Sequence, residues 1–186
     1  MDYPNPFRPG AGHPPPYLAG RSEEVSEFQK LLGQPRILTN LVLTGLRGVG
    51  KTVLLESALK PLARQNGWYW TGNELSETIN ISEERLALRL ITDLSLITSQ
   101  FEISRELVGG IGFLPQRQER LVTFDHPLMQ GLYERTPGLV SDKLKAVLET
   151  TWAVVKNSGV KGIVLAYDEA QNLTDRADKD QYPLSL

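Results

Sequence analysis

The stretch "LVLTGLRGVGKTVLLE", Leu41–Glu56, decides how this chain folds. An apolar run ends at Gly45, and two more glycines, a lysine and a threonine follow before an apolar, helix-like pattern begins. Positions 45–52 read Gly-x-x-x-x-Gly-Lys-Thr, a spacing that lets the backbone curl so that successive N–H groups point inward and hold a phosphate. The pattern therefore predicts a buried strand over 37–44, a phosphate-binding loop, and a helix from about Gly50.

The residues of this loop have distinct predicted roles. Lys51 is expected to reach the β- and γ-phosphates as a point charge, and Thr52 to offer its hydroxyl to Mg²⁺. The alternative is a chance glycine turn, but the apolar run before the loop and the helical pattern after it favour phosphate binding. Arg47 occupies a free position, where it either approaches the γ-phosphate or faces solvent or a partner. The residues expected to contact the nucleotide are Gly45, Arg47, Gly48, Val49, Gly50, Lys51, Thr52 and Val53.

A second group of functional side chains is predicted in "GIVLAYDEAQNL", residues 162–173. Its apolar run ends in Asp168 and Glu169. An aspartate at a strand end can hold Mg²⁺, and the following glutamate can act as the general base for an attacking water. The alternative is that both carboxylates begin a helix, whose N-terminus they would favour. Together with Lys51 they predict an ATP site, whereas Tyr167 is expected to pack under a helix.

Strands and helices are expected to alternate along the chain. Besides residues 37–44, the segment "WYWT" at 68–71 and residues 162–167 have strand character, and helical patterns separate the three. This alternation is typical of an α/β fold with a parallel sheet flanked by helices, and together with the motif at 45–52 it fits the sheet of a P-loop NTPase.

Local signals also predict where helices begin and end. Helices are expected to begin with Ser22 as an N-cap, at Asn80 or Ser82, and with Ser141 as an N-cap. Pro61 should kink or end the helix that follows the glycine loop, because its ring clashes with the carbonyl four residues back. Residues 104–140 are otherwise expected to be irregular.

The composition is that of an ordinary globular protein. The chain has 186 residues, 40% hydrophobic and 23% charged, with a formal net charge of −2. Acidic and basic side chains are evenly mixed, so no patch indicates nucleic-acid binding. The chain has no cysteine, which excludes disulfides and thiolate chemistry, and no apolar run approaches the roughly 20 residues that span a bilayer. We therefore expect a cytoplasmic protein without a membrane anchor.

Proline and glycine divide the chain into regions. Residues 1–16 contain six of the twelve prolines and are expected to form an extended lead-in. Residues 17–186 are expected to form the nucleotide-binding domain. Within it, residues 102–140 fit an insertion, a loop or hairpin that meets a partner, with "LVTF" at 121–124 as a short strand.

"GLRGVGKT" and "LAYDEAQ" resemble the Walker A and Walker B motifs of AAA-type P-loop ATPases, in particular bacterial and archaeal ATPases related to the replication-initiation and STAND groups. The segment "PPPYLAGRSEEVSEF" at 14–28 is similar to the element that packs over the adenine in those proteins. The resemblance implies ATP or ADP as ligand, Mg²⁺ as cofactor, and base contacts from Leu18, Gly20 and Arg21. The alternative for these three residues is a plain entry into a helix.

The resemblance also implies how much of an ATPase domain this sequence supplies. In that class a fourth strand, with a polar sensor residue, lies between the first and the third, and the arginine finger and helical lid come later still. The three predicted strands would be the first, second and third. The sequence is therefore expected to be the N-terminal part of a longer ATPase, ending shortly after the Walker B strand.

Three functions remain open from the sequence. The first is Mg²⁺-dependent ATP hydrolysis that drives a conformational switch, with Lys51 stabilising charge and Glu169 as base. The second is a nucleotide-dependent scaffold or regulator with little turnover, and the third, less favoured, is a P-loop small-molecule kinase. A protein partner is expected to bind through residues 102–140, or the chain to self-associate. The client, the pathway and the oligomeric state are not indicated.

Overall fold

The computed structural model of the chain describes residues 20–35, 39–75, 82–109 and 116–170. It divides into two compact units, Met1–Trp70 and Thr71–Leu186, and each is described by itself.

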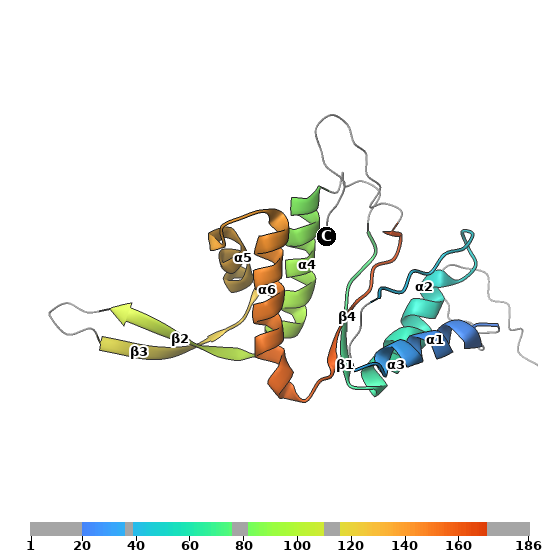
Figure 1. The fold of residues 1–186 in the computed structure, drawn as a ribbon, viewed down its shortest axis with the longest axis horizontal. Coiled ribbons are helices and arrows are strands. Elements are labelled where there is room, and N and C mark those ends of the chain that lie inside the picture. The colour runs from blue at the N-terminus through green and yellow to red at the C-terminus, as the bar shows by residue number, and fades with distance from the viewer. Residues whose placement is uncertain (1–19, 36–38, 76–81, 110–115, 171–186) are drawn as a thin grey trace, which may run out of the picture. The chain divides into compact units, whose positions relative to one another are not determined.

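The first unit is built on two helical segments (Figure 1). Helix α1 spans Ser22–Leu32, and its N-cap is Arg21 rather than the predicted Ser22. The second segment runs from Lys51 to Gln65 without a break and is made of three elements. These are α2 (Lys51–Leu54), the π-helical turn η1 (Leu55–Leu59) and α3 (Lys60–Gln65). The apolar residues buried in this unit are Phe28, Leu32, Leu54, Leu59, Ala63 and Trp70.

Pro61 does not end the second helical segment, although an early end was one of the predicted outcomes. In a regular α-helix its ring would clash with the carbonyl of Ser57, and it has no N–H to donate. The wider turn η1 directly precedes the proline, and there the N–H of Lys60 donates to the carbonyl of Leu55, five residues back. The change to π-helical spacing coincides with the proline, and the helix continues to Gln65.

The buried strand predicted at 37–44 is not present in its described part, residues 39–44. This backbone belongs to no strand, and the side chain of Val42 is 72% exposed. An apolar strand is stable only when neighbours pair with its backbone groups and cover its faces. Among the described strands, none pairs with this segment. The prediction was therefore wrong, because an apolar pattern alone does not supply the neighbouring strand.

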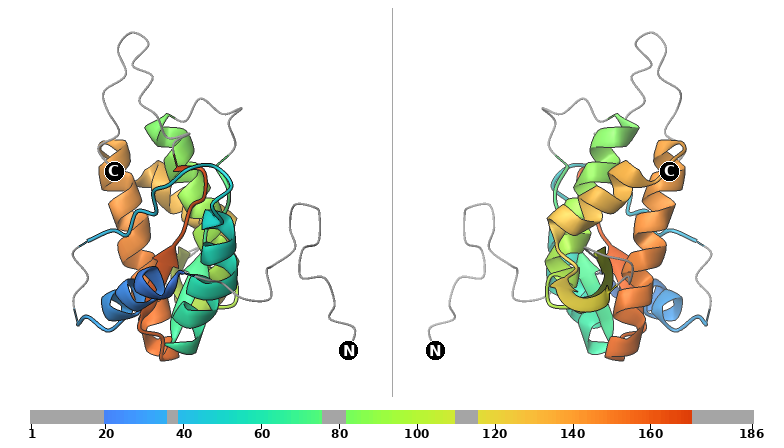
Figure 2. Two further views of the ribbon diagram at one scale, coloured as in Figure 1. Left: turned by 90° about the vertical axis from the view of Figure 1, so that its right-hand side faces the viewer. Right: turned by 90° about the vertical axis from the view of Figure 1, so that its left-hand side faces the viewer.

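The second unit is mainly helical. Helices α4 (Glu83–Thr98), α5 (His126–Arg135) and α6 (Val140–Val155) pack on one another (Figures 1 and 2). Ser82, one of the two predicted starts, caps α4: its Oγ accepts a hydrogen bond from the N–H of Arg85 at 3.3 Å. A short 3-10 turn, η2 (Lys156–Ser158), follows α6. The buried core consists of Ala87, Ile91, Leu94, Phe124, Met129, Tyr133, Leu144 and Val147.

Helix α5 lies in a region that was expected to be irregular. Its N-cap is Asp125, whose Oδ1 accepts a hydrogen bond from the N–H of Leu128 at 3.1 Å. Pro127 lies in the first turn, where its missing N–H costs nothing. An aspartate followed closely by a proline is a helix-start signal that the sequence does contain.

Helix α6 was predicted, but its cap was placed wrongly. The helix begins at Val140, so that Ser141 lies inside its first turn. The side chain of Asp142 reaches back and accepts a hydrogen bond from the N–H of Leu139 at 3.0 Å. Asp142, in the first turn, therefore caps the helix in place of Ser141.

Two small sheets complete the fold. Strands β1 (Trp68–Thr71) and β4 (Gly162–Leu165) form a two-stranded sheet at predicted positions. Strands β2 (Glu102–Gly109) and β3 (Gln116–Thr123) form an antiparallel hairpin, which pairs Glu102 with Thr123 and contains most of "LVTF". The chain is thus helical with a small parallel sheet, consistent with an α/β P-loop NTPase. That residues 102–140 are an insertion remains a prediction.

Candidate nucleotide-binding site

The predicted phosphate loop has a backbone that requires glycine. The φ angles are +153° at Gly45, +82° at Gly48 and +85° at Gly50, a region that other residues rarely adopt. A Cβ built on Gly48 or Gly50 would meet nothing within 4 Å, so backbone conformation, not space, requires glycine there. Helix α2 begins at the next residue, Lys51, so the loop leads directly into a helix N-terminus.

The side chain of Lys51 folds back over this loop. Its Nζ donates hydrogen bonds to the carbonyl oxygens of Gly45 and Leu46, each at 3.0 Å. The ammonium group therefore lies directly against the loop backbone. A cation in this place can meet an anion that enters the loop.

Arg21 connects α1 to the same loop. One guanidinium nitrogen donates to the carbonyl of Val49 at 2.6 Å, and another pairs with the carboxylate of Glu24 at 2.6 Å. The hydrogen bond from Arg21 lowers the pKa of Glu24 below its usual value. Arg21 was expected near the adenine, and the structure places its guanidinium on the backbone of the phosphate loop. Its contact with the base remains a prediction.

We expect Arg21→Ala to weaken ATP binding about threefold to tenfold, since a hydrogen bond from a charged group is worth about 1.5–3 kcal/mol at most and part of it is replaced by water. The variant frees the carbonyl of Val49 and so loosens the loop. Isothermal titration with ATP measures the change. Glu24→Gln is the matched control, because it removes the ion pair and leaves the bond from Arg21 to Val49 in place. Wild-type affinity in Arg21→Ala would show that this contact does not shape the loop.

The other predicted nucleotide contacts have different surroundings. Arg47 is exposed, and whether it approaches the γ-phosphate or faces solvent or a partner stays open. Thr52 is exposed in the first turn of α2, and Val53 is half-buried. Gly20 is exposed with φ of +71°, and Leu18 lies outside the described residues.

The predicted Asp168–Glu169 pair follows β4 in the second unit. Asp168 forms a parallel bridge with Glu74, and its carbonyl accepts a hydrogen bond from the N–H of Leu75 at 3.1 Å. Its Oδ1 accepts from the N–H of Glu169 at 2.9 Å. In the described part of the chain, Glu169 alone among non-glycine residues has a positive φ, of +55°. Such a backbone costs about 1 kcal/mol or more and is often found at functional sites.

A buried hydrogen-bonded group on α4 connects to this strand end. The carboxylate of Asp93 is 2% exposed, and its Oδ2 accepts from the hydroxyl of Tyr167 at 2.7 Å and from Nε of Arg89 at 3.1 Å. The hydroxyl of Thr71 donates to the Asp93 carbonyl at 2.7 Å. Burial, and then the hydrogen bond to Asp93, raise the pKa of Tyr167, so the phenol stays protonated and donates.

Sequence reasoning placed Tyr167 under a helix correctly but missed Asp93. The available signal was an aspartate in the middle of the apolar pattern of α4. A buried carboxylate must find partners, so such a residue indicates a polar contact within the core.

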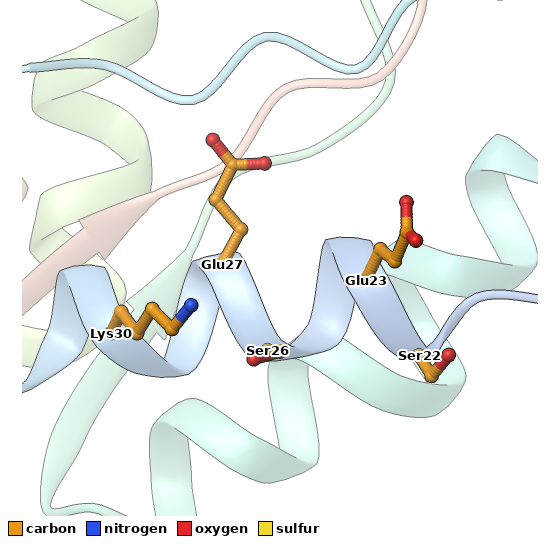
Figure 3. Close-up of a pocket in the computed structure, with 5 residues that line it drawn as sticks. All are labelled: Ser22, Glu23, Ser26, Glu27 and Lys30. Carbon is orange, nitrogen blue, oxygen red and sulfur yellow. The ribbon is translucent and has the colours of Figure 1, made fainter.

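A hollow on α1 is not the nucleotide site. It is lined by Ser22, Glu23, Ser26, Glu27 and Lys30, all from this one helix (Figure 3). Two of its five lining side chains are carboxylates, which repel phosphate, and none is a residue of the glycine loop.

Within the described ranges, no three histidine, aspartate or glutamate side chains come together to hold a metal ion. Mg²⁺ usually takes only one or two carboxylates and completes its shell with phosphate oxygens and water. The oxygen donors of Thr52 and Asp168 have the chemistry that this ion prefers. Lys51 and Thr52 belong to the first unit and Asp168 and Glu169 to the second. That they share one nucleotide remains a prediction.

A loop of left-handed glycines that leads into a helix at its lysine belongs to the P-loop class of nucleotide-binding proteins. Comparison with protein families agrees: the family model described as AAA ATPase domain matches residues 17–181, and the chain belongs to this family. Membership indicates ATP binding and hydrolysis. Searches of the curated proteins and of the solved structures found no match. In the described part, no helix is both long enough and apolar enough to cross a membrane.

Proposed function

We propose that this chain binds ATP through the loop Gly45–Thr52, its Walker A motif, and hydrolyses it with Mg²⁺ to drive a conformational switch. The observation that carries the proposal is the position of Lys51. Its ammonium lies on the loop carbonyls of Gly45 and Leu46, at the N-terminus of the helix that the loop begins.

Lys51 would bind a phosphate more strongly than it binds the two backbone carbonyls that it contacts in this structure. The carbonyls bonded to Lys51 are neutral acceptors, whereas phosphate oxygens carry charge, and charge-assisted hydrogen bonds are about twice as strong. The backbone N–H groups at the start of α2 and in the glycine turn add donors and a positive dipole end. Together these groups would hold the β- and γ-phosphates of a nucleotide.

Thr52 and Asp168 would hold the Mg²⁺ ion, through a hydroxyl and a carboxylate oxygen. Mg²⁺ would supply charge neutralisation at the phosphate oxygens. Asp168 is well suited to this part because its backbone is held by pairing with residues 74 and 75, through the bridge to Glu74 and the hydrogen bond from the N–H of Leu75.

Glu169 would act as the general base. It takes a proton from a water molecule while the water oxygen bonds to the γ-phosphorus and the bond to the β-phosphate oxygen breaks, leaving ADP and inorganic phosphate. Lys51 stabilises the charge that develops on the transferred group. The positive φ of Glu169 is the strained backbone that catalytic positions often have.

A scaffold that binds ATP with little turnover is the alternative, and Glu169→Gln distinguishes the two. We expect this variant to bind ATP like the wild type and to hydrolyse it at least about 100-fold more slowly, the typical contribution of a general base. Phosphate release under saturating ATP and Mg²⁺ measures the rate, and titration measures the affinity.

Glu74→Gln is the matched control, because this exposed carboxylate lies beside Asp168 and has no assigned catalytic part. Equal turnover in Glu169→Gln and wild type would remove Glu169 from the mechanism. Tight ATP binding without measurable turnover in the wild type would support the scaffold. The narrower relation to the replication-initiation and STAND groups, the protein partner and the cytoplasmic location stay predictions.

A further inference from the structure

Building on the proposed function, we propose that Asp93 is a positioning residue for catalysis: it holds Tyr167 and thereby aims Asp168 and Glu169. Asp93 lies in the middle of α4 and does not itself reach the reacting groups in this mechanism. Its side chain acts through the hydrogen bond that the hydroxyl of Tyr167 donates to Oδ2 at 2.7 Å.

The position of Tyr167 makes this bond effective. Tyr167 lies between Ala166, whose N–H donates to the Thr71 carbonyl, and Asp168, which forms a bridge with Glu74. A tyrosine bonded to α4 therefore restricts the backbone directly before Asp168 and Glu169.

Asp93 also holds the neighbouring segment through its backbone. Its carbonyl accepts from the Thr71 hydroxyl at 2.7 Å, and the Thr71 carbonyl accepts from the N–H of Ala166 at 2.9 Å. One residue of α4 thus contacts Thr71 and Tyr167, and Thr71 in turn pairs with the residue before Tyr167. The end of β4 is attached to α4 both directly and through its neighbour.

The chemistry of the hydrogen bond between Tyr167 and Asp93 indicates that Asp93 orients the tyrosine and does not merely fill space in the core. A buried carboxylate is costly, and in the described part of the chain Oδ2 of Asp93 accepts hydrogen bonds from Tyr167 and Arg89, which offset that cost. An apolar side chain of similar size would fill the same place in the core without the cost of burying a charge. What an apolar residue could not do is hold a phenol in one direction.

The test is Tyr167→Phe in the full chain, with two readouts. We expect kcat for ATP hydrolysis to fall about tenfold while KM for ATP changes less than about twofold, since displaced catalytic groups lose rate more than binding. We also expect faster amide hydrogen exchange at Leu75 and Ala166, whose N–H groups bond to Asp168 and Thr71.

Tyr133→Phe is the matched control. Tyr133 lies in the core of the same unit, and its buried hydroxyl has no hydrogen-bond partner in the structure as described. Removing that hydroxyl should leave both kcat and the exchange at Leu75 and Ala166 unchanged. Asp93→Asn, which keeps an oxygen acceptor and the size of the side chain, should give a loss smaller than that of Tyr167→Phe.

Turnover of the double variant Tyr167→Phe with Glu169→Gln distinguishes positioning of Glu169 from a purely structural role of the Tyr167 contact. If Tyr167 acts through Glu169, the double variant turns over as slowly as Glu169→Gln alone. If Tyr167→Phe had the same kcat per folded molecule as the wild type, the inference would be overturned, whether or not amide hydrogen exchange at Leu75 and Ala166 changed. The proposed function fails separately, if ATP binding by the wild type does not depend on Lys51; exchange at Leu75 and Ala166 then still shows whether Tyr167 holds the end of β4.

Discussion

Replacing Lys51 with alanine is expected to weaken ATP binding by about 100-fold or more. The variant removes a cation that lies on the loop carbonyls of Gly45 and Leu46 and would face the phosphates. A hydrogen bond between charged groups contributes about 3 kcal/mol at its strong end, which corresponds to about 100-fold in affinity. Isothermal titration of the full chain with ATP and with ADP measures the effect.

Lys60→Ala is the control for this prediction. Lys60 lies on the same helical segment as Lys51, but its Nζ pairs with the carboxylate of Glu56 at 2.5 Å. Its loss changes the net charge equally and should leave the affinity within about twofold, because exposed ion pairs contribute little. If Lys51→Ala bound ATP as tightly as Lys60→Ala does, the glycine loop would not be the phosphate site.

Replacing Gly72 with alanine is expected to destabilise the second unit by about 3 kcal/mol or more, the upper range for forced backbone strain and overpacking. A Cβ at this position would lie 2.0 Å from the carbonyl oxygen of Ala166 and 2.8 Å from its nitrogen. These are backbone atoms, so no side-chain rotation relieves the contact. The hydrogen bond from Ala166 to Thr71 at 2.9 Å would break, and the pairing at the end of β4 with it.

Gly159→Ala is the matched control for Gly72→Ala. Gly159 also has a positive φ, +83°, but a Cβ there would meet nothing within 4 Å. Alanine at this site is expected to lower the stability by only about 1 kcal/mol, because its Cβ disfavours the left-handed backbone conformation. Urea unfolding monitored by circular dichroism compares the two variants. Equal midpoints would mean that the close approach of Gly72 to Ala166 does not exist in solution.

The glycine loop is the part of the molecule that sequence reasoning predicted best. Its geometry is local: glycines at fixed spacing adopt left-handed φ angles, and a helix begins at Lys51. Strand β1 and the cap at Ser82 were also predicted, since each depends on a few consecutive residues. Such features follow from backbone preferences and short-range hydrogen bonds, which a linear sequence displays directly.

The errors arose where a local signal had competing outcomes. Residues 39–44 have the apolar pattern of a strand but no strand beside them in the described structure, so Val42 is exposed. Pro61 does not end its helix, which was one of the two outcomes predicted for it; a π-helical turn precedes it instead, and the kink stays a prediction. Ser141 has the right chemistry for an N-cap, but Asp142 caps the helix instead. Each local pattern was compatible with more than one structure, and it did not decide which of them formed.

The sequence by itself determined the backbone of the glycine loop and the helix start at Lys51, because both depend on residues that are neighbours in the chain. The roles of the loop and of the carboxylate pair stay predictions. Only the tertiary structure placed Arg21 on the carbonyl of Val49, 28 residues away, and Tyr167 on Asp93, 74 residues away. No local preference encodes such contacts. They form because packing brings a buried or partly buried polar group next to a partner, and a group without a partner would cost free energy.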